Sequence, residues 1–531
     1  MEPAIDGSVD TGLPGSPVKW AKAIDHESCI GCHACTTACK SENDVPLSVT
    51  RTYVKYADVG LFPQARRAFQ VTRCNQCELS PCTVACPTSA MYRRDDGIVD
   101  FDKSACIGCK ACIAACPYDA IFINPEDHSA EKCNFCAHRI DVGLEPACVV
   151  VCPTEAIMVG DMNDPTSRVS EMIHREPVSV RRPEKETWPK LYYRGAHQAT
   201  LDPLAAQRPP GEIFMWSQQT TGGHHVVSGH PDLPNSSAAA VLSYDVPHKA
   251  PWDWRVSLYT LTKGIAAGAY LVPLLLLLAG GFATGDLATG GLTASGALWQ
   301  WAAPVLAGLF LGITGLLLIW DLEQPARFYM IFTRPQWQSW LVRGAFVIAG
   351  YSAVLAAHFV GSLLGLARLQ QILAWIGLPL ATMTAVYTAY LLAQAKARDL
   401  WQSPLLPPHL FVQTLLAGAA ALAPVAAVLE PQAVPPLLWI VAGASLVHLL
   451  MVGGELTLTH GTAHAKLATH EMTGGRFKTA FWLGIALGAI GVAAPWLGLT
   501  LGAWLAAPLA LIGLFLFEHA FVQAGQSVPL A

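Results

Sequence analysis

All 16 cysteines of this 531-residue chain lie between Cys29 and Cys152, in four groups of four. The groups are Cys29, Cys32, Cys35 and Cys39; Cys74, Cys77, Cys82 and Cys86; Cys106, Cys109, Cys112 and Cys116; and Cys133, Cys136, Cys148 and Cys152. The first and third groups have the C-x2-C-x2-C-x3-C spacing that holds iron–sulfur clusters. A [4Fe–4S] cube needs one thiolate per iron, and one tight turn supplies only three of the four. Four groups therefore predict four [4Fe–4S] clusters.

Two other uses of cysteine fit this pattern less well. Disulfides require an oxidising compartment, and residues 1–20 contain neither an apolar signal segment nor twin arginines. Structural zinc sites use paired C-x2-C knuckles, which leave the third cysteine of each group without a role. Both comparisons favour iron–sulfur clusters.

The composition divides the chain into two unlike parts. Residues 1–250 carry 23 basic and 30 acidic side chains, whereas residues 251–531 carry only 11 and 9. The first part is typical of a soluble, mildly acidic domain, and the second of a membrane domain. Neither part has the basic patch that nucleic acid requires, so we expect no nucleic-acid partner.

The cysteine-rich part contains a duplication. The segment 25–35 recurs at 102–112, so the first cysteine group returns as the third after 77 residues, and the second returns as the fourth. Each group is expected to open a short helix after a tight turn, where Gly31 and Gly108 allow a close backbone approach. Short strands are expected at 97–101, 120–123 and 156–159. The fold predicted for residues 1–160 is an α+β, duplicated ferredoxin-like domain with four clusters.

The rest of the chain is expected to be an irregular linker over 161–250 and an all-α membrane domain over 251–531. Eight apolar spans of about 20 residues, each close to the length that crosses a bilayer, are predicted there. They are 258–282, 297–320, 341–364, 371–394, 410–429, 436–458, 479–497 and 501–522.

Basic residues predict which way these spans run. The loops on the side of the cysteine-rich domain hold eight: Arg327, Arg334, Arg343, Lys396, Arg398, Lys466, Arg476 and Lys478. The loops on the other side hold one, Arg368. Cytoplasmic loops are enriched in Lys and Arg, so we expect the cysteine-rich domain on the cytoplasmic side of a prokaryotic inner membrane.

The four cysteine groups resemble the four-cluster iron–sulfur subunit of the molybdopterin oxidoreductases, which include dimethyl-sulfoxide reductase, polysulfide reductase, formate dehydrogenase and nitrate reductase. The resemblance implies that group one shares ligands with group four, and group two with group three. The implied ligand sets are Cys29, Cys32, Cys35 and Cys152; Cys133, Cys136, Cys148 and Cys39; Cys74, Cys77, Cys82 and Cys116; and Cys106, Cys109, Cys112 and Cys86. It also implies a separate molybdopterin catalytic subunit as partner.

The second part resembles the NrfD/PsrC-type membrane subunits that accompany such iron–sulfur proteins. The stretches that carry this resemblance are 264–270, 321–329, 339–344 and 386–392. The resemblance implies an eight-helix anchor that binds a quinone, either ubiquinone or menaquinone, near a cluster. The presence of both subunits in one chain departs from the usual separate pair.

Ionisable side chains inside membrane spans are costly and often functional. A quinone needs hydrogen-bond donors to its carbonyls and a route for two protons, which Lys, Tyr, His and acidic side chains can supply. We predict a quinone site formed by Lys263, Asp321, Tyr387 and His448. The alternative is that Asp321 pairs with Arg327 at the end of a span and that Tyr387 is interfacial.

The histidines bear on other cofactors. Haem b needs two histidines at similar depth on different spans. His448 has no evident mate. His409 and His519 could pair near the cytoplasmic face, but His409, after two prolines, is expected in a loop, so no haem is expected. His224, His225 and His230 are expected to be solvated loop residues rather than a metal site, and so are His460, His464 and His470 with Glu455.

These observations predict the quinone-reactive electron-transfer and membrane-anchor subunit of a molybdopterin oxidoreductase. Electrons would pass between a catalytic partner and the quinone pool, with sulfite, another sulfur compound or formate as the substrate of that partner. The alternative is an energy-converting module that translocates protons, with His358 as part of its channel.

Overall fold

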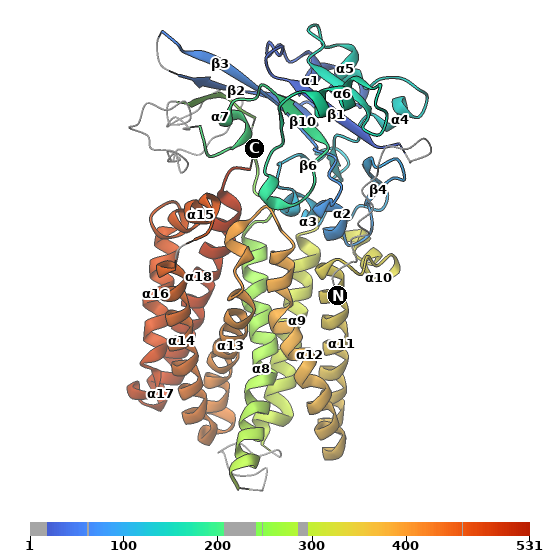
Figure 1. The fold of residues 1–531 in the computed structure, drawn as a ribbon. Helices are drawn as coiled ribbons and strands as arrows, with labels where there is room; N and C mark the ends of the chain where they lie inside the picture. Colours follow the sequence, from blue (N-terminus) through green and yellow to red (C-terminus); the bar gives the residue numbers. More distant parts are fainter. Residues whose placement is uncertain are drawn as a thin grey trace. The chain divides into compact units, whose positions relative to one another are not determined.

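The computed structural model describes residues 18–60, 63–206, 240–246, 248–284, 296–458 and 460–530, and of residues 280–284 only the backbone. The chain divides into two compact units. The cysteine-rich unit is residues 1–249 with 529–531, and the helical unit is residues 250–528. Figure 1 shows short helices and strands in the first and long helices side by side in the second.

The cysteine-rich unit is built on two small sheets. The first has the strand order β8-β1-β10-β9, with β10 parallel to β1 and the other neighbours antiparallel. Its strands are β1 (Trp20–Asp25), β8 (Ile157–Asp161), β9 (Val178–Ser179) and β10 (Leu191–Arg194). The second is antiparallel, in the order β11-β2-β3. Its strands are β2 (Thr52–Val59), β3 (Arg66–Arg73) and β11 (Val241–Tyr244).

Two hairpins, seven short α-helices and the 3₁₀ helix η1 (Pro183–Lys185) complete the described part of this unit. The hairpin strands are β4 (Met91–Arg93) with β5 (Val99–Phe101), and β6 (Ile121–Ile123) with β7 (Ala130–Lys132). The helices are α1 (Ala34–Glu42), α2 (Pro81–Ala85), α3 (Ala111–Ala115), α4 (Ala137–Ile140), α5 (Ala147–Val150), α6 (Arg168–Arg175) and α7 (Gln198–Leu201). The predicted strands near 97–101, 120–123 and 156–159 are confirmed, and each cysteine group lies beside a short helix.

The prediction of an irregular linker over 161–250 was wrong where this stretch forms two short helices, α6 and α7, and strands of both sheets. β10 lies beside β1 in the middle of the first sheet, and β11 extends the second sheet. Apolar residues do not recur at a regular spacing over a long part of this stretch. A four-residue strand needs only a few alternating side chains, so such strands are not visible in the sequence pattern. Strands from the beginning and from the end of the unit therefore pair in the same sheets.

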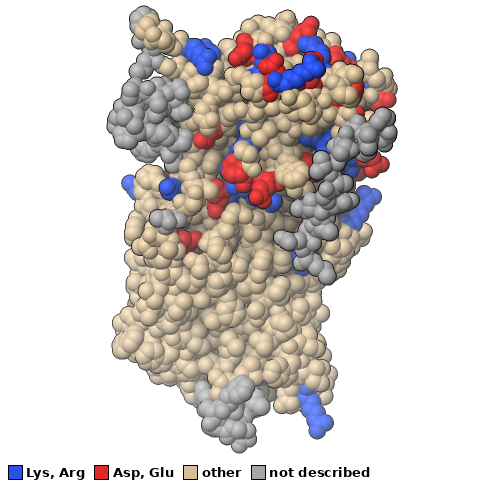
Figure 2. All heavy atoms as spheres, in the orientation of Figure 1, with Lys and Arg blue, Asp and Glu red and all other residues tan. Residues whose placement is uncertain are grey.

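The helical unit contains long apolar helices. They are α8 (Trp254–Thr284), α9 (Ala303–Trp320, preceded by the π-helix η2, Leu298–Ala302), α11 (Trp340–Leu363), α12 (Ala367–Ala393), α13 (Leu406–Leu429), α14 (Val434–Thr457), α16 (Lys478–Val492) and α18 (Ala507–Ser527). Shorter helices are α10 (Met330–Thr333), α15 (Ala463–Thr473) and α17 (Leu499–Leu501). Figure 2 shows that the visible side of this unit is almost free of charged side chains.

Seven helices in the described part of the chain are long and apolar enough to cross a membrane, so the protein is multi-pass. One of the eight predicted spans, 479–497, is not confirmed. α16 has only 15 residues and gives way at Ala494–Leu497 to a 3₁₀ turn, η6, that begins near Pro495. Proline has no amide hydrogen to continue the helix, which explains why the apolar run is longer than the helix.

Small residues bring the helices of this unit together. A Cβ placed on Gly418 of α13 would lie 2.1 Å from the carbonyl carbon of Gly268 on α8. A Cβ on Gly484 of α16 would lie 2.9 Å from the backbone of Gly513 on α18. Such contacts let helix backbones approach closely, as is usual inside membranes, where apolar burial does not drive helix association.

Candidate functional site

The turns around the first and third cysteine groups have the same backbone path. Gly31 and Gly108 have φ of +68° and +69°, and His33 and Lys110, two residues later, both have φ of +61°. A Cβ on Gly31 would lie 2.3 Å from the ring of Phe69. The duplicated sequence therefore folds into a duplicated turn that only glycine fits without strain.

The thiols of one group have neighbours in another. The pKa of the Cys39 thiol is raised to about 12, first by burial and then by three thiols of group four: Cys133, Cys148 and Cys136. Burial also raises the pKa of Cys29, and the nearby thiols are Cys35, Cys152 and Cys32. Groups one and four thus lie together, although about a hundred residues separate them.

Groups two and three are interleaved in the same way. Burial raises the pKa of Cys77 to about 12, with Cys74 and Cys116 as neighbouring thiols. Burial raises the pKa of Cys112 as well, and after burial the thiols of Cys109, Cys106 and Cys86 raise it most. These neighbours belong to the ligand sets implied by the resemblance, although which sulfurs hold iron stays a prediction.

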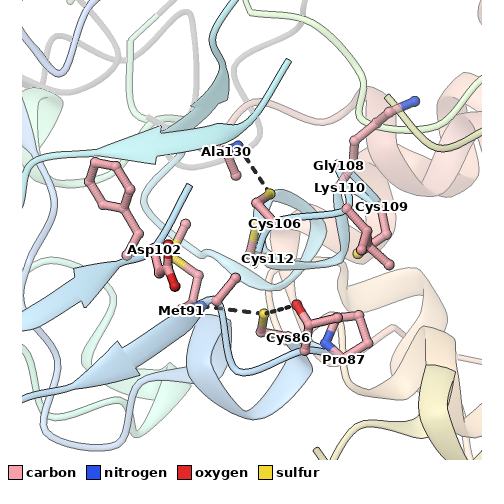
Figure 3. A pocket seen from close by; sticks show the side chains of 14 residues that line it. Cys86, Pro87, Met91, Asp102, Cys106, Gly108, Cys109, Lys110, Cys112 and Ala130 are labelled. Carbon is pink, nitrogen blue, oxygen red and sulfur yellow. Dashed lines mark hydrogen bonds between the residues drawn. The ribbon is translucent and has the colours of Figure 1, made fainter. Parts of the chain in front are cut away.

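One pocket gathers four of these cysteines. It is lined by Cys86 of group two together with Cys106, Cys109 and Cys112 of group three (Figure 3). Two backbone amides donate to sulfur there, Met91 N to Cys86 Sγ and Ala130 N to Cys106 Sγ, both at 3.4 Å. Four thiols around one space, with amides aimed at sulfur, are the donors that a negatively charged [4Fe–4S] cube requires.

The helical unit contains a second pocket, between four helices. It is lined by Thr260 of α8; Thr388 and Leu392 of α12; Leu406, His409, Leu410 and Gln413 of α13; and Phe517, Glu518, Phe521 and Val522 of α18. His409, Gln413 and Glu518, with the two threonines, are buried polar groups, and the rest of the lining is apolar. Thr260 Oγ1 donates to Glu518 Oε2 at 2.8 Å, so one wall holds a fixed carboxyl group.

Lys263 lies against this pocket without lining it. Its ammonium donates to Thr388 Oγ1 at 2.9 Å and to the Ala385 carbonyl at 2.8 Å, and it lies 5.4 Å from the ring centre of Tyr387. The side chains of Lys263 and Tyr387 are both buried. Two of the four residues predicted for the quinone site are therefore in contact, and Thr388 connects them to the pocket.

The other two predicted residues lie elsewhere. Asp321 follows the last residue of α9, where its carboxylate is 3.5 Å from the guanidinium of Arg255. His448 of α14 contacts His409, with 2.8 Å between His448 Nδ1 and His409 Nε2. His448 is thus one hydrogen bond away from the pocket, whereas Asp321 is not among its lining residues.

The prediction that His409 lies in a loop was wrong. His409 lies in the first turn of α13, where Pro407 and Pro408 begin the helix rather than prevent it. The sequence-based prediction also left Gln413, Thr260 and Glu518 out of the site. The signal for Gln413 was its position one helical turn after His409, which places both side chains on one face.

Two further groups of histidines were candidates for metal binding. His460 and His464 flank the start of α15, and His460 Nε2 lies 2.9 Å from Thr469 Oγ1. Over the described ranges, no three His, Cys, Asp or Glu side chains are arranged to hold a single metal ion. His224, His225 and His230 lie outside the described residues.

The fold and these two sites define a class of protein, an iron–sulfur module joined in one chain to a multi-pass membrane bundle. Family models agree on both parts. "4Fe-4S dicluster domain" matches residues 66–162, "4Fe-4S binding domain" matches 26–48, and "Polysulphide reductase, NrfD" matches 244–529. The last match spans more than half of the sequence, so this protein belongs to the NrfD polysulphide reductase family, with a 4Fe–4S module fused before it.

Curated relatives match the iron–sulfur part. A subunit of the tetrathionate reductase of Salmonella typhimurium is 41% identical over 213 residues, which is 38% of this chain and 82% of that protein. A component of the polysulfide reductase of Wolinella succinogenes is 43% identical over 177 residues, 33% of this chain and 93% of that protein. The protein is thus related to subunits of oxidoreductase complexes and carries a membrane domain in addition.

Proposed function

We propose that this chain is the electron-transfer and membrane-anchor subunit of a membrane-bound oxidoreductase, linking a catalytic partner to the quinone pool. The observation that carries the proposal is the presence, in one chain, of interleaved cysteine sets and a buried polar pocket between apolar helices. The first feature suits stepwise electron transfer, and the second suits a lipid-soluble carrier that exchanges protons.

Four [4Fe–4S] clusters are proposed, with the ligand sets named above. The neighbours of Cys39, Cys29, Cys77 and Cys112 support one set each. The clusters would supply one-electron chemistry, and the protein sets their potentials through charge and hydrogen bonds to sulfur. Four complete cubes require about sixteen iron and sixteen sulfide per chain.

The quinone is proposed to bind in the pocket between α8, α12, α13 and α18. His409 and Gln413 offer hydrogen bonds to the carbonyls of the headgroup, and the apolar lining accommodates its ring. Glu518, held by Thr260, and Lys263, held by Thr388, are placed to exchange protons with it. Relative to the sequence prediction, the proposed site keeps Lys263, Tyr387 and His448 as surrounding residues and omits Asp321.

The catalytic partner is proposed to be a molybdopterin subunit acting on an inorganic sulfur compound. The sulfur substrate rests on relatives that belong to a tetrathionate reductase and a polysulfide reductase, and the molybdopterin rests on the resemblance of the four cysteine groups. The excess of basic residues in one set of loops supports a cytoplasmic location for the cysteine-rich unit. The partner, with its metal, should copurify with the chain.

Stopped-flow spectroscopy of the detergent-solubilised protein tests the quinone pocket. A quinol analogue should bleach the visible absorbance of the oxidised clusters in the wild-type protein. Lys263→Ala and Glu518→Gln should slow this reaction at least about tenfold with iron content unchanged, because each removes a proton-exchanging group. Lys478→Ala, at the start of α16, is the matched control. Wild-type rates in both pocket variants would remove the pocket from the proposal.

A second candidate function is proton translocation, favoured by the contact between His409 and His448. That pair extends the polar groups of the pocket from α13 to α14. In liposomes, a proton-to-electron ratio above that of quinone chemistry alone, lost in His448→Phe, would support it. A proton-to-electron ratio equal to that of quinone chemistry would exclude proton translocation and leave electron transfer as the only proposed function.

A further inference from the structure

Three cations are buried among the cysteines of the first unit. Arg73, Lys22 and Lys132 each have at most 1% of their surface exposed. A buried cation is costly unless negative charge lies beside it, so their positions indicate where the unit concentrates negative charge. Two of the three lie against the same group of sulfurs.

Arg73 ends β3 and reaches into group four. Its Nη1 donates to Cys148 Sγ at 3.1 Å, while its Nε and Nη2 are buried without a hydrogen-bond partner in the described structure. Burial would lower the pKa of this guanidinium, but the thiols of Cys148, Cys35 and Cys133 raise it. Arginine thus holds a fixed positive charge beside these sulfurs, and the N–H groups of two of its nitrogens, Nε and Nη2, are left for an anion.

Lys22 of β1 approaches the same sulfurs from the other sheet. Its ammonium lies 3.8 Å from Cys133 Sγ and 4.2 Å from the ring centre of Phe135. A neutral donor adds to these cations, since Asn43 Nδ2 is 3.7 Å from Cys39 Sγ and 3.8 Å from Cys136 Sγ. All four sulfurs of the set Cys39, Cys133, Cys136 and Cys148 therefore face an N–H donor.

The duplication provides an internal comparison. Lys132 precedes Cys133 as Arg73 precedes Cys74, but the ammonium of Lys132 donates to the carbonyls of Val99 and Cys133. The position that corresponds to Lys22, 77 residues later, is the uncharged Val99. The donors found on Cys86 and Cys106 are neutral backbone amides. The two repeats thus differ in their contacts to sulfur: Arg73 and Lys22 donate to sulfur directly, whereas Lys132 donates to carbonyls and acts on the nearby Cys82 thiol through its charge.

We propose that Arg73 and Lys22 give the cluster on Cys39, Cys133, Cys136 and Cys148 the most positive reduction potential of the four, so that it receives the first electron. Reduction adds negative charge to a cluster, and a fixed cation within hydrogen-bond distance of its sulfurs stabilises the reduced form. The inference rests on the proposed function, since it requires the four clusters.

An EPR-monitored redox titration of the full-length protein in detergent tests it. Arg73→Met and Lys22→Met should each shift the most positive midpoint in the negative direction, by a tenfold or larger change in the equilibrium, or about 59 mV for one electron. Arg73→Lys, which keeps the charge, should leave the most positive midpoint close to its wild-type value. Arg66→Met, at the exposed start of the same strand, should change none of the midpoints. Cys39→Ser identifies the signal, because it should alter the spectrum of the same cluster.

The outcomes separate this inference from the proposed function. Iron and sulfide well below about sixteen each in the wild-type protein would contradict the four clusters themselves. Two results would overturn the inference and leave the four clusters in place. In one, the highest midpoint is unchanged in Lys22→Met. In the other, the midpoint that shifts belongs to a signal that Cys39→Ser leaves intact. If Arg73→Met loses a cluster, Lys22→Met still tests the inference. The Lys22 ammonium is farther from sulfur than the Arg73 guanidinium, so its removal should leave the cluster in place.

Discussion

The contacts of His248 predict a pH dependence for the segment that precedes the first membrane helix. Its ring contacts two carboxylates, with Nε2 3.0 Å from Asp245 Oδ1 and Nδ1 against Asp119, and Asp245 also pairs with Lys55 at 3.5 Å. Burial alone would lower the pKa of His248, but Asp245 and Asp119 outweigh it and raise the pKa to about 9. The imidazolium therefore fastens the end of β11 to the loop after Cys116.

The magnitude follows from this pKa. A rise from 6.5 to about 9 corresponds to about 3 kcal/mol at 1.36 kcal/mol per pH unit. About 2 kcal/mol is a better figure, because 26% of the side chain is exposed to screening solvent. Since the folded-state pKa is the higher one, this stabilisation is complete below pH 6.5, decreases as the pH rises and is lost above about pH 9.

Hydrogen exchange of β11, measured by mass spectrometry on the full chain, provides the assay. At about pH 6 the amides of Val241–Tyr244 should exchange about thirtyfold faster in His248→Gln than in the wild type, which is the ratio equivalent to about 2 kcal/mol. The two proteins should converge near about pH 9. His174→Gln, on α6, is the control. An exchange ratio that is equal at the two pH values would refute the role assigned to the imidazolium charge.

Three other predictions concern packing and ligands. Gly418→Ala should lower the stability of the helical unit by about 1–3 kcal/mol, because its Cβ meets the α8 backbone. Gly312→Ala, with open space around the Cβ, should leave the stability unchanged. Thermal unfolding in detergent distinguishes the two variants. Gly31→Ala should weaken cluster retention, because its Cβ would meet the ring of Phe69. Gly143 has a similar φ but no neighbour within 4 Å, so Gly143→Ala should lose less iron, through the strained dihedral alone. Iron content after dilution measures both. Cys152→Ser should remove up to about a quarter of the iron; full iron content with an unchanged EPR spectrum would exclude Cys152 as a ligand.

The sequence by itself determined the features that depend on spacing along the chain. Cysteine intervals indicated the kind of cofactor, and the repeated segments predicted the repeated turn at Gly31 and Gly108. Runs of apolar residues located seven of the eight expected spans. Each of these depends on neighbours within one turn, one repeat or one helix, so no knowledge of packing was needed.

Only the tertiary structure decided which distant residues meet. It placed β10 beside β1, brought His409 to His448, and assembled the pocket around Glu518 from four helices. It also set Arg73 and Lys22 against the sulfurs of one group, which the cysteine spacing does not reveal. These contacts join elements whose separate patterns are compatible with many arrangements. Packing of whole faces, rather than any local preference, selects among them.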